Sequence, residues 1–182
     1  DEWNTHWGER GSVAMGVYAA GVLHLLSREG TRWGLDRAYF FMPINEGAIK
    51  VAPRTAELDA AGEVFALERV HQDNRLLPLP DLPNDADLDA LASLSADGRT
   101  IYVTAVNRSV SETHRLHCAR RGGVRPKTVA VRELIPLGLG AASPGFRRGE
   151  RRIAPDPDGS VTVSIPPCAV VRVRLGPAQH GE

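Results

Sequence analysis

The chain has 182 residues, of which 42% are hydrophobic and 24% are charged, a composition typical of a folded globular protein rather than a disordered one. Lysine and arginine together number 22, as do aspartate and glutamate, so the formal net charge is +0. This balance argues against nucleic acid or an acidic membrane surface as the partner and favours a neutral one such as a sugar.

The chain opens with the sequence Asp-Glu-Trp-Asn-Thr-His-Trp-Gly, which combines the residue types of a sugar-cleaving site. Glu2 supplies a carboxylate that can attack or stabilise an oxocarbenium-like centre. Trp3 and Trp7 supply flat apolar surfaces, and Asn4 supplies an amide that can hydrogen-bond a ring hydroxyl. The alternative is a solvated carboxylate at a frayed terminus beside two packed tryptophans. Local spacing alone does not separate these two interpretations.

The next segments predict a helix, a strand and a second helix. Ser12 can cap a helix over Val13–Leu26, which is apolar nearly all round and is therefore expected to be buried on every side, and Gly30 lies near its end. This run is shorter than the roughly 20 residues of a membrane span. Residues Arg37–Ile44 contain a continuous apolar run, typical of a parallel strand covered on both faces. Residues Ala60–Gln72 predict the last helix.

A change of hydrophobic period predicts a division of the chain into 1–76, a proline-rich connector at 77–87, and 88–182. Prolines 78, 80 and 83 favour an extended connector. Beyond it, apolar residues recur at every second position, as expected for strands with one apolar face. The alternating sets are Leu88, Ala90, Ala92 and Leu94; Ile101, Val103 and Ala105; and Val161, Val163 and Ile165. The last region is therefore predicted to be an antiparallel, jelly-roll-like β-sandwich.

Turn signals predict how these strands connect. Asp97-Gly98 and Asp158-Gly159 are typical of hairpin turns. After Pro166-Pro167, residues Val170–Leu175 are expected to return and pair with Val161–Ile165.

Several polar clusters are interpreted as structural. His114, His117 and Cys118 do not predict a metal site, because strand residues three apart point to opposite faces. Cys118 and Cys168 are expected to be buried thiols without a disulfide bond. The arginine pairs at 120–121, 147–148 and 151–152 are expected in solvated loops rather than on a nucleic-acid surface. The sequence contains no glycine-rich motif of the kind that holds a nucleotide phosphate, so no cofactor is expected.

The tetrapeptide Asp-Glu-Trp-Asn resembles the nucleophile segment of the α-L-arabinofuranosidases of glycoside hydrolase family 51. The similarity continues in order through Ile44-Asn45, Val64-Phe65, Val70-His71-Gln72 and the segments Ile101–Asn107 and Val161–Pro167, which look like strands of the family's C-terminal domain. The resemblance implies that 1–76 carries the last β/α elements of a (β/α)8 barrel, with strands seven and eight ending near Glu2 and Ile44.

The resemblance also implies roles for residues. It makes Glu2 the nucleophile of a retaining enzyme whose acid/base glutamate lies upstream, outside this chain. The implied substrate is an arabinofuranosyl-containing oligosaccharide or polysaccharide, and the implied sugar contacts are Trp3, Asn4, His6, Trp7 and Asn45. The chain departs from the family at His6, where members usually carry tryptophan, and at Met42, where they place a sugar-binding glutamine. Sugar contacts near strand eight are therefore expected to differ.

The resemblance further implies a cytoplasmic enzyme and leaves a homo-oligomer open, while the balanced charge and the short apolar run predict neither a nucleic-acid nor a membrane partner. Without the rest of the barrel, the 182-residue chain alone is expected to be inactive. The alternative is a non-catalytic β-sandwich, either an accessory or a carbohydrate-binding module, whose helices only dock it to another domain. The position of Glu2 and the presence of a second carboxylate distinguish the two interpretations.

Overall fold

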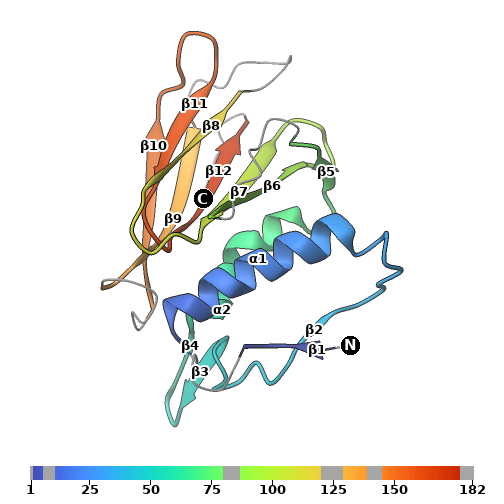
Figure 1. Cartoon of the computed structure of the whole chain (residues 1–182), viewed down its shortest axis with the longest axis vertical. Helices are drawn as coiled ribbons and strands as arrows, with labels where there is room; N and C mark the ends of the chain where they lie inside the picture. Colours follow the sequence, from blue (N-terminus) through green and yellow to red (C-terminus); the bar gives the residue numbers. More distant parts are fainter. Residues whose placement is uncertain (1, 6–10, 80–86, 120–128, 139–144, 177–182) are drawn as a thin grey trace.

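The computed structural model describes residues 2–5, 11–79, 87–119, 129–138 and 145–176. At its centre lies a twisted, antiparallel six-stranded sheet. Two helices cover one face of this sheet, and a separate pair of strands covers the other (Figure 1). No helix in these ranges is long and apolar enough to span a membrane.

The two helices begin where side-chain caps are available. Helix α1 (Val13–Glu29) follows Ser12, whose hydroxyl oxygen accepts a hydrogen bond from the Met15 backbone N–H at 3.3 Å. Helix α2 (Ala60–Glu68) follows Asp59, whose carboxylate accepts from the Ala60 N–H at 2.9 Å. It continues into a 3-10 turn, η2 (Arg69–His71). Both predicted helices are thus confirmed.

Burial of α1 on every side, however, was a wrong prediction. In the described part of the chain, α2 and the sheet cover one side of α1 only, so Tyr18 is 45% and Leu25 43% exposed. The side facing α2 carries the small residues Gly16, Ala19 and Ala20, all buried. A Cβ on Gly16 would lie 2.4 Å from the Phe146 ring, so this position requires glycine unless the ring moves.

The N-terminal strands form a short parallel pair. Strand β1 (Glu2–Trp3) aligns with β2 (Tyr39–Phe40), with Glu2 opposite Tyr39 and Trp3 opposite Phe40. The strand predicted over Arg37–Ile44 is therefore reduced to two residues. Coverage on both faces is also corrected, because Tyr39 is 56% exposed and Phe41 38%. A parallel strand is enclosed only when both faces are packed, and the described residues supply a single packed layer here.

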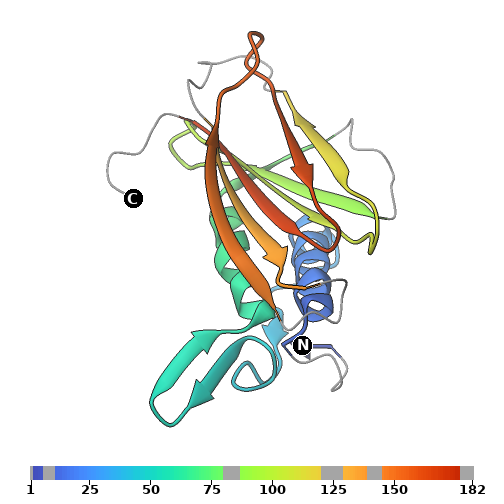
Figure 2. The same cartoon turned by 90° about the vertical axis from the view of Figure 1, so that its left-hand side faces the viewer.

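A hairpin that the sequence did not predict follows β2. Its strands are β3 (Ile49–Ala52) and β4 (Thr55–Leu58), which pair antiparallel and project away from the rest of the chain (Figure 2). Of their residues only Ile49 is not exposed. Their apolar residues do alternate with polar ones, but each strand has only four residues, and so short an alternation is a weak signal that the sequence analysis missed.

The six-stranded sheet has the order β10-β9-β12-β7-β6-β5. Its strands are β5 (Arg75–Leu77), β6 (Leu88–Leu94), β7 (Ile101–Asn107), β9 (Val129–Pro136), β10 (Phe146–Ile153) and β12 (Val170–Leu175). Strands β8 (His114–Cys118) and β11 (Val161–Ile165) form the separate antiparallel pair. The predicted hairpin at Asp97-Gly98 is confirmed, since it joins β6 to β7 and Gly98 has a φ of +71°.

Three sequence-based expectations about strands are corrected. Strand β12 pairs with β7 and β9, not with β11. The Asp158-Gly159 turn connects β10 to β11, which belong to different sheets, so it is not a hairpin turn. The arginines at 147–148 and 151–152 lie in the edge strand β10 rather than in loops. Charged side chains suit an edge strand, because they oppose pairing with another chain.

The corner between β11 and β12 explains the first correction. At Pro166-Pro167 the chain passes from one sheet to the other, and Cys168 adopts a positive φ of 55°. The Asn107 side chain holds this corner, since its amide donates to the carbonyl oxygens of Ile165 at 2.9 Å and Pro166 at 3.0 Å. Strand β12 therefore enters the sheet beside β7 instead of folding back on β11.

The main hydrophobic core lies between the two sheets. It is built from alternate residues of the strands, among them Ala90, Ala92, Val103, Ala105, Val129, Val131, Val163, Ile165, Val171 and Val173. Both cysteines are buried and free, as expected. Cys118 lies in β8, where burial raises the pKa of its thiol to about 12. Cys168 lies at the corner before β12.

Candidate functional site

Glu2 is the exposed first residue of strand β1, one residue before the strand pair ends at Trp3 and Phe40. Two hydrogen bonds hold the two strand ends together directly after this position. The Phe41 N–H donates to the Trp3 carbonyl oxygen at 2.9 Å, and the Asn4 side-chain amide donates to the Phe41 carbonyl oxygen at 2.6 Å. Parallel strands end at the same edge, which in β/α barrels is the edge that carries the active site.

Trp3 lies in an aromatic cluster between β1 and the two helices. Its ring centroid is 5.0 Å from that of Phe40, 5.8 Å from Phe65 and 6.3 Å from Tyr18, and its plane is stacked on Phe65 at 21°. Successive strand residues point to opposite faces, so Glu2 faces away from this cluster. The indole of Trp3 therefore fixes the strand that carries Glu2.

Asn45 holds the turn that leads into the β3–β4 hairpin. It adopts a positive φ of 57°, which asparagine tolerates better than most residues. Its side-chain oxygen accepts from the Val51 N–H at 2.7 Å, and its own N–H donates to the Ile49 carbonyl oxygen at 2.7 Å. His6 and Trp7 lie outside the described residues. The predicted sugar contacts therefore stay predictions at all five positions: Trp3, Asn4, His6, Trp7 and Asn45.

Within the described ranges, no group of three or more His, Cys, Asp or Glu side chains is placed to hold a metal ion. His117 lies on the exposed side of β8. Its Nδ1 is 3.2 Å from the Thr162 hydroxyl of β11.

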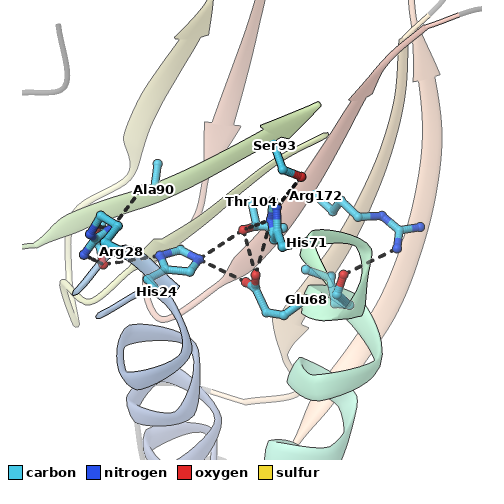
Figure 3. A network of polar contacts seen from close by, with 10 residues as sticks. His24, Arg28, Glu68, His71, Ala90, Ser93, Thr104 and Arg172 are labelled. Carbon is cyan, nitrogen blue, oxygen red and sulfur yellow. Dashed lines mark hydrogen bonds and ion pairs between the residues drawn. The ribbon is translucent and has the colours of Figure 1, made fainter. Parts of the chain in front are cut away.

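A second cluster of ionisable groups lies where the helices meet the six-stranded sheet (Figure 3). His24 and Arg28 come from α1, Glu68 and His71 from α2 and its 3-10 turn, and the remaining members from β6, β7 and β12. We call these side chains the buried network: His24, Arg28, Glu68, His71, Asp89, Ser93, Thr104 and Arg172. Its members other than Arg28 are at most 9% exposed.

Three ion pairs form one end of the network. The Arg28 guanidinium donates to both oxygens of Asp89, at 2.9 and 3.1 Å, and to the Ala90 carbonyl oxygen at 3.0 Å. His24 is fully buried, with Nδ1 3.3 Å from Asp89 Oδ2 and Nε2 3.1 Å from Glu68 Oε1. Asp89 thus joins β6 to two positions of α1, and His24 joins α1 to α2.

Hydrogen bonds through hydroxyl groups form the other end. The Thr104 hydroxyl donates to Glu68 Oε2 at 2.8 Å and lies 2.8 Å from His71 Nε2. His71 Nδ1 lies 2.7 Å from the Ser93 hydroxyl. Arg172 donates to the Leu67 carbonyl oxygen at 3.4 Å. Strands β6, β7 and β12 are therefore all connected to α2.

The network shifts the pKa of the two histidines in opposite directions. Burial by itself lowers the pKa of His24, but the charge of Glu68 and the hydrogen bonds to Asp89 and Glu68 outweigh it and raise the pKa to about 9. Burial lowers the pKa of His71 to about 4, despite the charge of Glu68. Burial also opposes ionisation of Asp89, yet its hydrogen bonds to His24 and Arg28 hold the pKa of this carboxyl well below its usual range.

Sequence reasoning missed this network. The signal for His24 was its place on the side of α1 where the small residues lie. Asp89 and Ser93 occupy the positions of β6 that alternate with the apolar ones. Because these side chains are enclosed, a substrate has no access to them, so the candidate active site is the edge at Glu2.

No model of a protein family matches the sequence, and no curated protein matches it. Solved structures match the fold over nearly the whole chain. The thermostable family 51 α-L-arabinofuranosidase of Thermotoga petrophila RKU-1 has a TM-score of 0.74 at 19% identity, covering 96% of this chain and 42% of that one. The α-L-arabinofuranosidase of Thermotoga maritima in its arabinose complex has a TM-score of 0.74 at 20% identity, covering 97% and 42%.

The same fold occurs in another glycosidase family. A Paenibacillus polymyxa xyloglucanase of glycoside hydrolase family 44 has a TM-score of 0.63 at 12% identity, covering 91% of this chain and 29% of that one. The similarity to family 51 enzymes inferred from the sequence is thus confirmed at the level of the fold. This chain spans less than half the length of each of these enzymes.

Proposed function

We propose that this chain is the C-terminal portion of a retaining α-L-arabinofuranosidase that removes terminal α-L-arabinofuranosyl residues from arabinose-containing oligosaccharides or polysaccharides. One observation carries the proposal. Glu2, the glutamate of the Asp-Glu-Trp-Asn segment, lies in a parallel strand one residue before its C-terminal end, in a chain whose fold matches solved arabinofuranosidases over 96 to 97% of its residues.

The order of elements before the sheet supports a barrel. Strand β1, helix α1 and strand β2 form a parallel strand-helix-strand unit, and α2 follows β2 as the next helix. In this proposal β1 and β2 are strands seven and eight of a (β/α)8 barrel. Tyr18, Leu25 and Tyr39, which are exposed here, would then contact other barrel elements.

The chemistry requires two carboxyl groups. In the proposed reaction, Glu2 attacks the anomeric carbon while a second carboxylic acid, supplied by another part of the polypeptide, protonates the departing glycosidic oxygen. That second group, at about 5 to 5.5 Å from Glu2, then removes a proton from water, and the resulting hydroxide displaces Glu2 from the sugar. The exposure of Glu2 on the face opposite Trp3 leaves its carboxylate available for this attack.

The other predicted contacts receive different roles. Asn4 is held by Phe41 beside Glu2 and is proposed to contact the sugar ring or to orient the strand end. Trp7 and His6 are proposed as the walls of the sugar site, because the indole of Trp3 is engaged by Phe65 and Tyr18. Asn45 is proposed to shape the hairpin turn that borders the same edge.

The test is the substitution Glu2→Gln in the full-length protein, assayed by release of a chromogenic group from an α-L-arabinofuranoside. The amide keeps the shape of the side chain but removes its charge and nucleophilicity, so kcat should fall by about a thousandfold or more with little change in stability. Glu57→Gln, in the exposed β3–β4 hairpin, is the matched control and should leave kcat unchanged.

A second experiment distinguishes a nucleophile from an acid/base residue. In Glu2→Ala, added azide should restore turnover of an activated aryl arabinofuranoside, by attacking the anomeric carbon as the aryl oxide leaves. The product azide should have the configuration opposite to that of the substrate. Equal rates for wild type and Glu2→Gln would contradict the proposal and favour the alternative, a non-catalytic β-sandwich accessory or carbohydrate-binding module.

A further inference from the structure

His24 has an unusual environment for a buried histidine, because both of its ring nitrogens face carboxylates. Nδ1 lies 3.3 Å from an Asp89 oxygen, and Nε2 lies 3.1 Å from a Glu68 oxygen and 3.0 Å from the Thr104 hydroxyl. The imidazole is fully buried, so water cannot insert between these partners. The carboxylates come from strand β6 and helix α2, and His24 itself comes from α1.

A count of hydrogens decides the protonation state. Ionised carboxylates only accept hydrogen bonds, and a neutral imidazole carries one N–H. A neutral His24 would therefore turn a nitrogen lone pair toward Asp89 or Glu68. Only the imidazolium, with an N–H on each nitrogen, donates to both, and its positive charge compensates the two buried anions together with Arg28.

The same count leaves His71 neutral. The Thr104 hydroxyl gives its single hydrogen to Glu68 Oε2, so its oxygen is left to accept from His71 Nε2–H at 2.8 Å. Nδ1 of His71 then carries a lone pair, which accepts from the Ser93 hydroxyl at 2.7 Å. Every polar hydrogen in this series then has an acceptor, with His24 charged and His71 uncharged; the His24 Nε2–H is shared between Glu68 Oε1 at 3.1 Å and the Thr104 oxygen at 3.0 Å.

We propose that protonated His24 is a pH-sensitive latch that fastens α1 and α2 to the six-stranded sheet. Its two N–H groups connect three elements. Without them, Asp89 and Glu68 each lose a hydrogen bond and a nearby positive charge. The charged and titratable groups around it are Arg28 on α1, Glu68 on α2, His71 on η2, Asp89 on β6 and Arg172 on β12. This latch does not depend on the proposed enzymatic activity.

The latch is expected to open at alkaline pH. Folding raises the pKa of His24 from 6.5 to about 9, so its contribution is complete below pH 6.5 and is lost as the pH rises through 9. Asp89, whose pKa is lowered, is ionised throughout this window. Because His71 titrates near pH 4, it is neutral there and does not contribute to the change.

The protonation state can be measured directly by NMR. In the full-length protein labelled with 15N-histidine, the His24 signals are assigned by their loss in His24→Gln. At pH 8, a pKa of about 9 predicts a protonated-to-neutral ratio of about 10 to 1, whereas an ordinary pKa of 6.5 predicts about 1 to 30. In Glu68→Gln the His24 pKa should fall, because the largest of the contributions that raise it is removed. A neutral His24 at pH 7 in wild type would overturn the proposal.

The latch itself can be followed by hydrogen–deuterium exchange, with each rate divided by its intrinsic value at that pH. Between pH 6.5 and 10, protection of α1 and α2 peptides should fall by about a hundredfold, as expected from the shift of the His24 pKa. Peptides of β8 and β11 should keep their protection. In His24→Gln the helices should be poorly protected at every pH, while His117→Gln, a control on the exposed side of β8, should follow wild type. Protection of α1 and α2 that does not change with pH in wild type would overturn the latch.

Discussion

The two faces of the six-stranded sheet solve the same packing problem with different chemistry. Toward β8 and β11, the strands present mainly apolar side chains such as Ala90, Val103 and Val171. Toward the helices, the alternate positions of the same strands present Asp89, Thr104 and Arg172. One face is therefore held by apolar contact, while the other also requires a closed set of charges and hydrogen bonds.

This difference teaches where the fold is tolerant and where it is specific. Apolar contact is non-directional and insensitive to pH. Buried charges stabilise only when every partner is present, since an unpaired one loses its hydration without compensation. The sandwich face should respond to changes in volume, and the helix face to changes in charge. Four substitutions test this contrast.

The largest effect is expected at Asp89, which bridges Arg28 and His24. Asp89→Ala leaves both cations without their shared anion, so the free energy of unfolding should fall by about 3 to 5 kcal/mol. Urea unfolding at pH 7 measures this loss, and adding Arg28→Met should restore part of it by removing one unpaired charge. Glu57→Ala in the exposed hairpin is the control. A loss below about 1 kcal/mol would show that the network contributes little.

On the sandwich face, Ile165→Ala should cost about 2 to 4 kcal/mol, because this fully buried side chain leaves a cavity between the sheets. No titratable group is changed, so the cost should be equal at pH 5 and pH 9 in urea unfolding. Val110→Ala, at a residue 67% exposed, should have almost no effect. A cost for Ile165→Ala that varies strongly with pH would remove the contrast between the two faces.

The loss of stability at acidic pH should depend on the titration of His71. Its folded pKa of about 4 lies below the ordinary 6.5, so the unfolded chain takes up this proton first and stability is lost as the pH falls from 6.5 toward 4. The maximum loss is about 3 kcal/mol. In His71→Gln, the amide can still donate to Thr104 and accept from Ser93 but does not titrate. The decrease of the unfolding free energy between pH 6.5 and 4 should then be smaller than in wild type, whereas His117→Gln should show the wild-type decrease. An equal decrease in wild type and His71→Gln would contradict the prediction.

The smallest effect extends the comparison to the outer side of the helices. Phe65→Leu removes the ring stacked on Trp3 and should cost about 1 kcal/mol. If Trp3 fixes the strand that carries Glu2, kcat of the full-length enzyme should also fall severalfold. Phe146→Leu removes a ring of equal size from the contact between sheet and helices and should leave kcat unchanged. Equal losses of kcat in both variants would show that the packing of Trp3 does not position Glu2 for the reaction.

Several features of the fold could be predicted from local sequence alone. Ser12 marks the start of α1 because a side-chain cap is a local interaction. The period of two in β6, β7 and β11 identified strands, and Asp97-Gly98 identified the β6–β7 hairpin. The Asp-Glu-Trp-Asn segment singled out Glu2 by chemistry and resemblance, independently of its surroundings.

Other features were decided only by the tertiary structure. Alternation assigns each side chain to a face of a sheet but does not specify the neighbouring strand, so the pairing of β12 with β7 and β9 could not be predicted. The strand β10 was hidden because an exposed edge does not need an apolar face. His24, Glu68 and Asp89 are far apart in the sequence, and nothing in the local pattern around any of them points to the other two. Their meaning depends on partners from three elements, since a buried charge is stabilised only by the groups that folding brings within hydrogen-bond distance.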